Sequence, residues 1–593
     1  MNKIKIMVVM LIVLVTISLI YIFTKENVMD SNIINIEYKE DDIDWEKIDK
    51  TYISFSDSSI EVEGEGATVD GSIVTLKSGG SYYLEGTLTN GGVIVDSSDE
   101  VYIILNGVDI TNETSSAIYI KNAKIVYLNI NESTVNTLTD GVSYQNDSSE
   151  DIDATIYSKD DLVIMGTGTL NIMANYNHGI HSKDYIQILD GSINIISKNE
   201  GIKGKDYVAI KDGNISIKSE SDGIQATNEN DSTLGYIVID GGVFNIDSVG
   251  DGISAMTKLS ITNGVFNIKT GGGSKNDSTS SLWGSWGNVN DISSKGLKAG
   301  ELIVIEGGDF EIDTSDDAIH SNNSIVIKDG VFIINSGDDG IHSDTSLIID
   351  GGNIDVKKSY EGIESLSITI NDGNINVVAS DDGINAAGGN DASSINGRRG
   401  QNNISNGSVK IIINGGYVYI NSTGDGIDSN GSVVLSDGIV LVDGPTNSGN
   451  GALDYDTTFV ISGGTLIAAG SSGMSQNPSS TSTQNIIAVN FSSSKSSGEI
   501  INITDSLGEE IITYAPSKTY QSVVVSTPSI RNGETYKIYS GGSYSVIPSN
   551  GLYTGGRYTS GSLYEEVKVE NILTVLGNTM GAMNNMGPHG GRR

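Results

Sequence analysis

Apolar and polar residues alternate along most of the chain in runs of four or five, and each run ends at glycine, asparagine or aspartate. Examples are Ile325-Val-Ile-Lys-Asp-Gly and Leu347-Ile-Ile-Asp-Gly, which precede the runs Val331-Phe-Ile-Ile and Asn353-Ile-Asp-Val. A period of two predicts β-strands, and Gly, Asn and Asp are typical of the turns between them. No ten-residue window carries the apolar stripe of a helix, so the pattern predicts an all-β protein.

A third run returns at a nearly constant spacing. Its versions read SKGLKA, DDAIHS, DDGIHS, YEGIES and DDGINA, and their Gly or Ala falls at 296, 318, 340, 362 and 383, a period of 22, 22, 22 and 21 residues. A repeat of this length is one supersecondary unit stacked on its own copies. The leucine-rich repeat has a similar period, but its leucine and asparagine consensus is missing here. The sequence therefore predicts a right-handed parallel β-helix solenoid with about 22 residues and three strands per coil.

One apolar position of this repeat should form an inner ladder. Its members are Ile180, Ile202, Ile224, Ile253, Leu297, Ile319, Ile341, Ile363, Ile384 and Ile427. Because successive side chains on a strand point to opposite faces, the residue after each of them should face outward. We therefore expect an exposed column on one sheet, formed by Lys298, His320, His342, Glu364 and Asn385.

The repeat also sets the domain boundaries. We expect a signal peptide or membrane anchor in residues 1–25, a linker and solenoid cap in 26–90, and the β-helix in 91–484. The period stops near residue 485, so residues 485–570 are predicted to form a small C-terminal β module. The tail, residues 571–593, is rich in Gly, Asn and Met and is predicted to be disordered.

The N-terminal segment predicts the location of the protein. After Lys3 and Lys5, residues 6–23 are apolar apart from Thr16, Ser18 and Tyr21. Eighteen such residues suffice for a membrane anchor and exceed a typical signal-peptide core, and the positive flank should stay cytoplasmic. We therefore expect an extracellular protein, either secreted or anchored to the outer face of the plasma membrane.

Composition limits the classes of ligand that the protein is expected to bind. The chain of 593 residues has a net charge of −40, 73 glycines and no cysteine. Such acidity argues against nucleic acid, whose phosphates need a basic surface, and favours cations or ligands bridged by cations. The oligomeric state is left open by the sequence.

The acidic residues that precede the glycines of the repeat should repel one another when the coils stack. They occur as Glu200, Asp222, Asp251, Asp317, Asp339, Glu361, Asp382 and Asp425, with doublets at Asp316, Asp338 and Asp381. Stacked in register about 5 Å apart, neighbouring carboxylates repel by about 3–4 kcal/mol at an effective dielectric constant near 20. Protonation, hydrogen bonds from turn amides, or a hard cation such as Ca²⁺ could each offset this repulsion.

We predict Ca²⁺ as the cofactor. The predicted metal ligands are Asp316, Asp317, Asp338, Asp339, Glu361, Asp381, Asp382, Asp222 and Asp251. The first five of these are the preferred set, because they carry acidic doublets on adjacent coils. Turn aspartates that only accept amide hydrogen bonds are the alternative.

Carbohydrate contacts are predicted on the exposed column and on one insertion. The period is broken by residues 271–293, which contain Trp283 and Trp286, by 387–408, and by a shorter insertion, 227–234. A tryptophan ring suits stacking on a pyranose, although packing of the loop onto the rod is equally compatible with these residues. His320 and His342 could instead be transition-metal ligands.

The recurrent DDGIHS, DGGxFxI and DGINA phrases, with GGTLIAAGSSGMSQNPSSTSTQ at 463–484, resemble the clostridial carbohydrate-binding β-helix proteins over residues 50–570. This resemblance implies a pectate-lyase-like fold, association with calcium, and binding of cellulose or acidic, pectin-like polysaccharides at the cell surface. It does not assign the calcium ligands, because the acidic phrase recurs too often.

Two other functions stay open. A lyase or glycoside hydrolase acting on polyuronates would use Asp316-Asp317 or Asp338-Asp339 as a carboxylate pair, or Lys203, Lys295 or Lys298 as a base. The N-T-D and R-I-K phrases of polygalacturonases are missing, and a pair that recurs on several coils does not mark a single catalytic centre. A structural adhesion protein is the second alternative. We favour a non-catalytic polysaccharide-binding protein.

Overall fold

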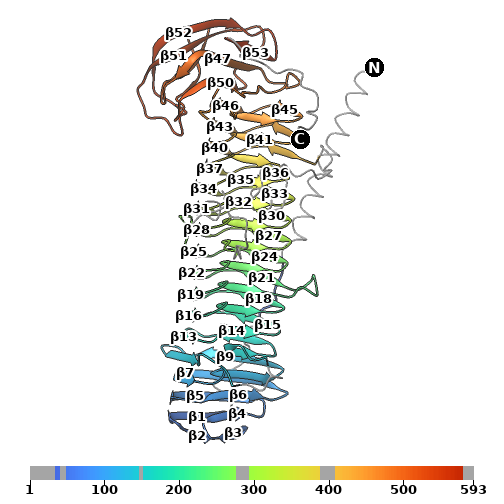
Figure 1. Cartoon of the computed structure of the whole chain (residues 1–593), viewed down its shortest axis with the longest axis vertical. Coiled ribbons are helices and arrows are strands. Elements are labelled where there is room, and N and C mark those ends of the chain that lie inside the picture. Colours follow the sequence, from blue (N-terminus) through green and yellow to red (C-terminus); the bar gives the residue numbers. More distant parts are fainter. Residues whose placement is uncertain (1–33, 40–48, 146–150, 276–292, 388–407, 578–593) are drawn as a thin grey trace, which may run out of the picture.

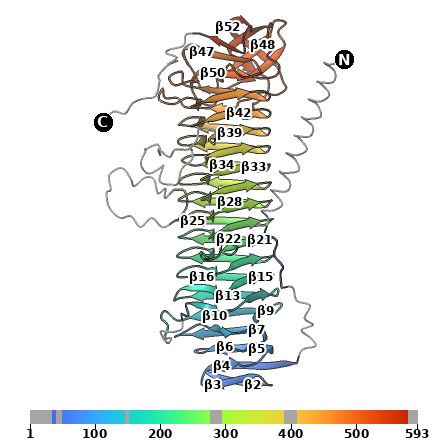
Figure 2. The same ribbon diagram turned by 90° about the vertical axis from the view of Figure 1, so that its right-hand side faces the viewer.

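The chain winds into a long rod of stacked β-strands that carries a smaller β module at one end (Figure 1). The computed structural model describes residues 34–39, 49–145, 151–275, 293–387 and 408–577. Within these residues each coil contributes three short strands, and equivalent strands of successive coils pair in parallel. A quarter turn of the view shows the strands as flat rungs along the whole rod (Figure 2).

The first column of strands forms a 16-stranded sheet and contains the GIHS phrases. Its strands are β3 (Ala67–Asp70), β4 (Ile73–Leu76), β6 (Gly92–Asp96), β8 (Ile118–Asn122), β11 (Ala154–Ser158), β14 (His178–Ser182), β17 (Ile202–Gly204), β20 (Ile224–Ala226), β23 (Ile253–Ala255), β26 (Leu297–Ala299), β29 (Ile319–Ser321), β32 (Ile341–Ser343), β35 (Ile363–Ser365), β38 (Ile384–Ala386), β41 (Ile427–Ser429) and β44 (Leu453–Tyr455).

The second and third columns belong to one 33-stranded sheet. The second column comprises β9 (Ile125–Ile130), β12 (Leu162–Met165), β15 (Tyr185–Ile188), β18 (Tyr207–Ile210), β21 (Tyr236–Ile239), β24 (Lys258–Ile261), β27 (Leu302–Ile305), β30 (Ser324–Ile327), β33 (Ser346–Ile349), β36 (Ser367–Ile370), β39 (Lys410–Ile413), β42 (Ser432–Leu435) and β45 (Thr458–Ile461). The third comprises β10 (Val135–Asp140), β13 (Thr169–Ala174), β16 (Ser192–Ser197), β19 (Asn214–Ser219), β22 (Val243–Ser248), β25 (Val265–Thr270), β28 (Asp309–Thr314), β31 (Val331–Asn335), β34 (Asn353–Lys358), β37 (Asn374–Ala379), β40 (Tyr417–Ser422), β43 (Ile439–Asp443) and β46 (Thr465–Gly470).

Long strands join these two columns at the N-terminal end of the rod. They are β1 (Lys50–Asp57), β5 (Gly80–Leu88) and β7 (Glu100–Asn112). The first half of β7 pairs with β9 and its second half with β10, so one strand spans both columns.

The predicted inner ladder is the centre of the core. Every isoleucine and leucine predicted for it is fully buried, and the pairing register places Ile319 beside Ile341 and Ile341 beside Ile363. Phenylalanines form a second ladder inside the rod, in which Phe266 and Phe310 stack with ring centroids 4.6 Å apart. In-register stacking of identical side chains fills the core at uniform density, because each rung repeats the shape of the last.

The glycine of the repeat is explained by a close approach between coils. A Cβ atom at Gly340 would lie 2.6 Å from the carbonyl oxygen of Gly362 on the next coil. Adjacent coils are thus too close at this point for large side chains, and the phrase has glycine there or, in DDAIHS, alanine.

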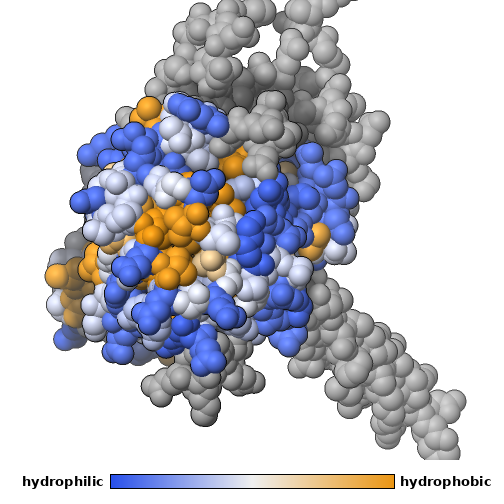
Figure 3. All heavy atoms as spheres, turned by 90° about the horizontal axis from the view of Figure 1, so that it is seen from below, coloured by the Kyte–Doolittle hydropathy of each residue, from blue (hydrophilic) through white to orange (hydrophobic). Residues whose placement is uncertain are grey.

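Antiparallel strands cover the N-terminal end of the rod. β2 (Ser59–Glu63) folds back on β1, and β3 on β4. Ile60, Val62 and Ala67 pack against the core there but stay partly exposed, and apolar atoms are visible at the centre of this end (Figure 3). The N-terminal cap therefore closes the core only in part.

The C-terminal module continues the solenoid and adds a separate sheet. β47 (Ile486–Lys495) and β46 both pair antiparallel with β50 (Tyr520–Ser526), and β53 (Leu573–Leu576) pairs in parallel with β47. The separate sheet is antiparallel and has the order β49-β48-β51-β52. Its strands are β48 (Ile501–Asp505), β49 (Glu510–Tyr514), β51 (Thr535–Tyr544) and β52 (Tyr558–Lys568).

Buried Asp443 fixes the module to the last coils. Its carboxylate accepts hydrogen bonds from the Tyr514 hydroxyl at 2.8 Å, the Tyr419 hydroxyl at 2.9 Å and the Ser517 amide at 2.9 Å. Three donors from both parts of the chain satisfy one buried charge, which makes this junction specific.

The predicted fold class is confirmed: the chain is an all-β parallel β-helix with a small C-terminal β module. The predicted tail begins too early, because β53 extends the ordered chain beyond residue 571. That strand is apolar at Leu573 and Leu576 and pairs with β47, a long-range contact that composition does not reveal. The segment predicted as a signal or anchor, residues 1–25, lies outside the described residues.

Candidate functional site

The register of the 16-stranded sheet gathers polar side chains into one line, which we call the polar column. It consists of Tyr119, Tyr157, His181, Lys203, Gln225, Ser254, Lys298, His320, His342, Glu364, Asn385, Asp428 and Asp454, each paired with the next. The predicted stacking from Lys298 to Asn385 is therefore present. The column changes from aromatic at its N-terminal end to basic in the middle and acidic at its C-terminal end.

The predicted exposure of this column is wrong. His320 and His342 are each 2% exposed, Glu364 and Asn385 are buried, and only Lys298 is partly open, with 29% of its side chain exposed. Each side chain lies against equivalent side chains on adjacent coils, as in the stacked imidazoles of His320 and His342, whose centroids are 4.9 Å apart. The polar column is thus a buried network in these coils and does not form an open binding strip.

The acidic residue before each glycine has a structural role through one of its oxygens. Asp317 Oδ1 accepts the backbone N–H of Asp339 at 2.9 Å, and Asp222 Oδ1 accepts that of Asp251 at 2.8 Å. Both bonds connect one coil to the next. A carboxylate that accepts a buried turn amide satisfies a donor that would otherwise be unpaired, so this part of the ladder is explained without a metal.

In the central coils the second carboxylate oxygen of the acidic residue lies next to a lysine or histidine side chain. Lys295 Nζ lies 2.8 Å from Asp317 Oδ2 and 2.9 Å from Asp316 Oδ1. His320 Nδ1 lies 2.9 Å from Asp317 Oδ2. Burial alone would raise the pKa of Asp317, but Lys295 and His320 hold it well below its usual range.

His342 is the second internal cation. Its Nδ1 lies 3.0 Å from Asp339 Oδ2 and 2.9 Å from Glu364 Oε2, and its Nε2 lies 3.3 Å from Asp344 Oδ1. Burial lowers the pKa of the imidazole, yet the three carboxylates around the ring outweigh it and raise the pKa of His342 well above its usual value. Lysine and histidine side chains thus contact Asp317 and Asp339, but they do not balance the charge of the whole preferred calcium set. Burial, together with the charges of neighbouring carboxylates, raises the pKa of Asp339 and of Glu361 well above the usual range.

Other predicted ligands of the ladder also have partners within the protein. Lys298 Nζ lies 2.9 Å from Asp251 Oδ2, and the Gln225 amide donates to Asp222 Oδ2 at 2.7 Å. Burial, and after it the charge of Asp251, raises the pKa of Asp222 to about 7. These contacts fix the carboxylates in place on the buried side of the ladder.

Glu361 and Asp338 complete the predicted set in the central coils. The Asn385 amide donates to Glu361 Oε2 at 2.8 Å. Asp316, Asp317 and Asp338 each place one oxygen within 4.8 Å of the others, although Lys295 lies against two of them. This group has the oxygen ligands of a cation site and already contains an ammonium group.

The C-terminal coils bring three carboxylates together at partly exposed positions. Asp382, Asp425 and Asp428 each place one oxygen within 4.8 Å of the others. Asp382 Oδ1 accepts the Asp425 N–H at 2.5 Å, and Asp381 on the same turn faces the Tyr360 hydroxyl. Burial, followed by the charges of neighbouring aspartates, raises the pKa of Asp382 to about 8. We call Asp382, Asp425 and Asp428 the acidic triad.

Sequence reasoning missed Asp428 as a ligand. It occupies, in the phrase GDGIDS, the position that histidine holds in DDGIHS. Comparing the residue after each ladder isoleucine would have found it, because Asp428 there faces the same side as the acidic residue three positions earlier.

A histidine cluster in the N-terminal coils was also missed. Asp153, His178 and His181 each offer one ligand atom within 4.8 Å of the others. The signal is the phrase NHGIHS at 177–182, where His178 replaces the usual acidic residue before glycine.

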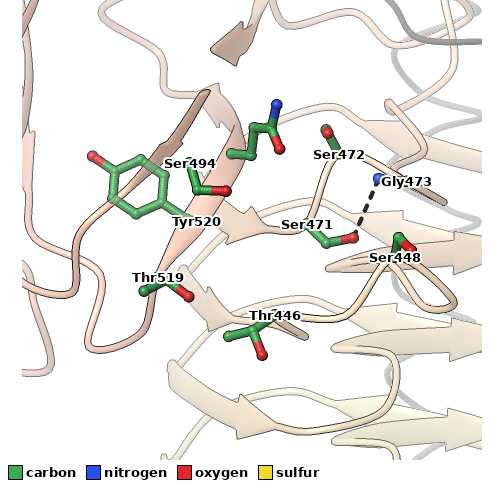
Figure 4. Close-up of a pocket in the computed structure, with 9 residues that line it drawn as sticks. Thr446, Ser448, Ser471, Ser472, Gly473, Ser494, Thr519 and Tyr520 are labelled. Atoms are coloured by element: carbon green, nitrogen blue, oxygen red, sulfur yellow. Dashed lines mark hydrogen bonds between the residues drawn. The ribbon is translucent and has the colours of Figure 1, made fainter. Parts of the chain in front are cut away.

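A pocket of about 250 Å³ lies where the last coils meet the C-terminal module (Figure 4). Most residues that line it carry a hydroxyl or an amide group; they are Thr446, Ser448, Ser471, Ser472, Gly473, Ser494, Thr519, Tyr520 and Gln521. None of these lining residues is acidic. The pocket therefore suits hydrogen bonding to a neutral hydroxylated molecule, whereas glycoside cleavage would need paired carboxylates.

Some predicted residues cannot be placed. Trp283 and Trp286 lie outside the described residues, as does the apolar segment 6–23. In the part of the chain that the structure describes, no helix has the length and apolar character required to cross a membrane.

Comparison with known proteins connects the solenoid to a family. The family model described as "Carbohydrate-binding domain-containing protein" matches residues 70–340 and 339–508. A protein of Acetivibrio thermocellus with the same description is 34% identical over 148 residues, which is 24% of this chain and 52% of that protein. The chain thus spans about half the length of this curated relative.

A solved structure is also similar to part of the chain. It is the gadolinium derivative of a polysaccharide lyase-like protein from C. thermocellum, with 34% identity and a TM-score of 0.37, and the match covers 38% of this chain and 92% of that one. The two ranges matched by the family model together span more than half of the 593 residues, and the chain therefore belongs to the family of carbohydrate-binding domain-containing proteins.

Proposed function

We propose that this protein binds polysaccharides outside the cell in a Ca²⁺-dependent manner. The observation that carries the proposal is the acidic triad, whose three carboxylates converge within 4.8 Å at partly exposed positions. Membership of a carbohydrate-binding family supplies the class of ligand. Localisation follows the expectation from Lys3, Lys5 and the apolar segment 6–23, namely secretion or anchorage to the outer face of the plasma membrane.

Oxygen-only ligands favour Ca²⁺ over transition metals. Ca²⁺ takes six to eight oxygens from carboxylates, carbonyls and waters, so three carboxylates leave several positions for water or for a ligand. Burial, and after it the repulsion from neighbouring aspartates, raises the pKa of Asp382 in the absence of a cation. A bound Ca²⁺ would replace that repulsion with attraction.

The charge of the chain indicates how an acidic glycan could bind. With a net charge of −40, the protein repels a polyuronate at long range unless a cation lies between them. We propose that Ca²⁺ on the acidic triad shares its open positions with carboxylates and hydroxyls of a pectin-like glycan. A neutral glycan such as cellulose would rely on hydroxyl-rich surfaces such as the pocket around Ser471 and Gln521, and on the predicted Trp283 and Trp286.

The enzymatic alternative receives less support from the geometry. A lyase base must be neutral and must reach the substrate, whereas the ammonium groups of Lys203, Lys295 and Lys298 lie 3.6, 2.8 and 2.9 Å from carboxylate oxygens. Asp317 and Asp339, one member of each carboxylate pair, are buried and hydrogen-bonded to the next coil. These contacts favour binding without cleavage.

The proposal is tested by retention on immobilised polygalacturonate and cellulose, with Ca²⁺ and with EDTA. The variant Asp382→Asn keeps an oxygen that can accept the Asp425 N–H but removes the charge, and we expect it to lose Ca²⁺-dependent retention on polygalacturonate. Asp372→Asn is the matched control, because Asp372 is an exposed turn residue that accepts only the N–H of its neighbour Gly373. Retention that EDTA leaves unchanged would exclude the calcium role, and release of unsaturated uronides would favour a lyase. No retention on any glycan would favour the adhesion alternative.

A further inference from the structure

The histidine cluster in the N-terminal coils differs from the rest of the ladder in its chemistry. Asp153 directly precedes β11, and His178 and His181 lie on the next strand of the column, β14. At the position of His178 the later coils carry a carboxylate, as in Glu200, Asp222 and Asp251. This coil therefore presents two imidazoles where the others present one at most.

The ligand atoms of the cluster converge on one point. His181 Nδ1 lies 2.5 Å from Asp153 Oδ1, and His178 Nε2 lies 3.4 Å from Asp153 Oδ2. The two rings meet edge to face at 77°, with centroids 5.2 Å apart. The side chains of His178 and His181 are 3% and 4% exposed, whereas that of Asp153 is 22% exposed, so an ion could enter from the carboxylate side.

A second observation concerns the far side of His178. Its Nδ1 lies 2.5 Å from Glu200 Oε2, yet both atoms are buried and neither makes a hydrogen bond of acceptable geometry. Buried polar atoms are normally satisfied, and an exception needs a cause. In metal sites a ligating histidine commonly directs its other ring nitrogen to a carboxylate, and Glu200 lies in that position.

The histidines of the central coils provide the contrast. His320 has Asp317 at Nδ1 and Asn322 at Nε2, each at 2.9 Å, so both of its nitrogens have protein partners. His178 Nε2 lies 3.4 Å from Asp153 Oδ2, while His181 Nδ1 takes the other oxygen of that carboxylate, Oδ1. The Nε2 contact of His178 is thus longer than either contact of His320, and an ion between the three ligands would replace it with direct coordination.

We propose that Asp153, His178 and His181 bind a divalent transition-metal ion, with Zn²⁺ as the best fit. Imidazole nitrogens with one carboxylate suit Zn²⁺, whereas Ca²⁺ takes oxygen ligands, so this site is chemically distinct from the acidic triad and does not rest on the proposed calcium role. Glu200 is a positioning residue that orients His178. Because the ligands come from adjacent coils, the ion would join the coils of β11 and β14.

The test is a calorimetric titration of the full chain with Zn²⁺, after treatment with EDTA and dialysis into saturating Ca²⁺. We expect one Zn²⁺ per chain with micromolar or tighter affinity. His178→Gln and His181→Gln should abolish this binding, and Glu200→Gln should weaken it by about 10- to 100-fold. The matched control is His342→Gln, a buried histidine of the same column, which should keep wild-type affinity.

A spectroscopic measurement on the wild type does not depend on how the variants fold. Cu²⁺ bound in place of Zn²⁺ should show, in its electron paramagnetic resonance spectrum, coupling to the nitrogens of the two imidazoles. The proposal is overturned if the wild type binds no stoichiometric Zn²⁺, if the spectrum lacks nitrogen coupling, or if His342→Gln loses affinity while folded His178→Gln and His181→Gln keep it.

Discussion

The carboxylate at the same turn position has opposite electrostatic surroundings in the central coils and in the C-terminal coils. At Asp317 the protein supplies Lys295 and His320, and the pKa of the carboxyl is held well below its usual range. At Asp382 the neighbours are other aspartates, and burial together with their charge raises the pKa to about 8. Both carboxylates accept a backbone N–H from the next coil, so their backbone role is identical.

The two turns differ in the polar-column residues that lie near them, on the same coil and on adjacent coils. In the central coils the polar column contributes His320 and His342, whereas in the C-terminal coils it contributes Asp428 and Asp454. The same turn position can thus contact a cationic side chain or other carboxylates without any change of fold. The acidic residue alone does not indicate which of the two it is.

Removing the ammonium group of Lys295 should have the largest effect on the free energy of unfolding. Lys295→Met leaves Asp316 and Asp317 buried without their ammonium partner, and breaking a buried pair in this way costs about 3–5 kcal/mol. We expect the free energy of unfolding, measured in urea, to fall by that amount. Lys328→Met is the control, because the Lys328–Glu306 pair is partly exposed and should cost at most about 1 kcal/mol. Equal losses in the two variants would contradict the distinction between a buried network and a surface pair.

Calcium should stabilise the C-terminal coils. At a concentration of about 100 times its dissociation constant, Ca²⁺ should add about 2.7 kcal/mol to the unfolding free energy. Asp428→His, which copies the central coils, should remove this gain and should raise the midpoint of thermal unfolding in EDTA, because it deletes a like charge. Differential scanning calorimetry with and without Ca²⁺ measures both effects. If Asp428→His still responds to Ca²⁺ as the wild type does, the acidic triad is not the site.

The pH dependence of the calcium-free protein should follow from the raised pKa values of Asp222, about 7, and Asp382, about 8. Between pH 5 and 8 the folded state holds protons on these groups that the unfolded state has already released, so stability falls as pH rises. His342, whose pKa is also raised, contributes in the same direction. We expect a loss of several kcal/mol from pH 5 to pH 8 in EDTA, read from urea midpoints, because each such group loses about 1.4 kcal/mol per pH unit until its folded-state pKa is reached.

Calcium should reduce this loss, because it favours the ionised form of Asp382. A stability that rises from pH 5 to pH 8 in EDTA would mean that groups which release protons on folding dominate in this range, and it would contradict the comparison. The variant Asp382→Asn should flatten the calcium-free profile.

The smallest effect is expected at the edge of the buried network. Lys298 pairs with Asp251 at 2.9 Å but keeps 29% of its side chain exposed, so solvent already screens the pair. Lys298→Met should therefore reduce the unfolding free energy by about 1 kcal/mol, well below the loss at Lys295. A loss as large as that of Lys295→Met would mean that Asp251 depends on Lys298 as fully as Asp317 depends on Lys295.

The period of the sequence was sufficient to predict the solenoid. A spacing of 22 residues with isoleucine at one position fixes which side chains stack, and Ile319, Ile341 and Ile363 lie in register as expected. The register also placed His320 beside His342 correctly. Exposure could not be read in the same way, because alternation along a strand gives the direction of a side chain but not what covers it.

The candidate ligands were predicted only in part for a related reason. Asp381 and Asp382 were found through their acidic doublet, whereas Asp428 and His178 were missed because each breaks the consensus of the repeat. In a solenoid the consensus reports what stacking requires, and the departures from it indicate where a ligand could bind.

By itself the sequence determined the fold, the stacking register, the acidic character and the family of this protein. Each of these depends on local periodicity or on composition, which every coil repeats. The tertiary structure decided which carboxylates are balanced by Lys295 and His342, which remain together in the acidic triad, and which histidines converge near Asp153. Those outcomes depend on side chains from neighbouring coils within a few ångströms of one another, and at such distances one substitution changes the sign of the local charge.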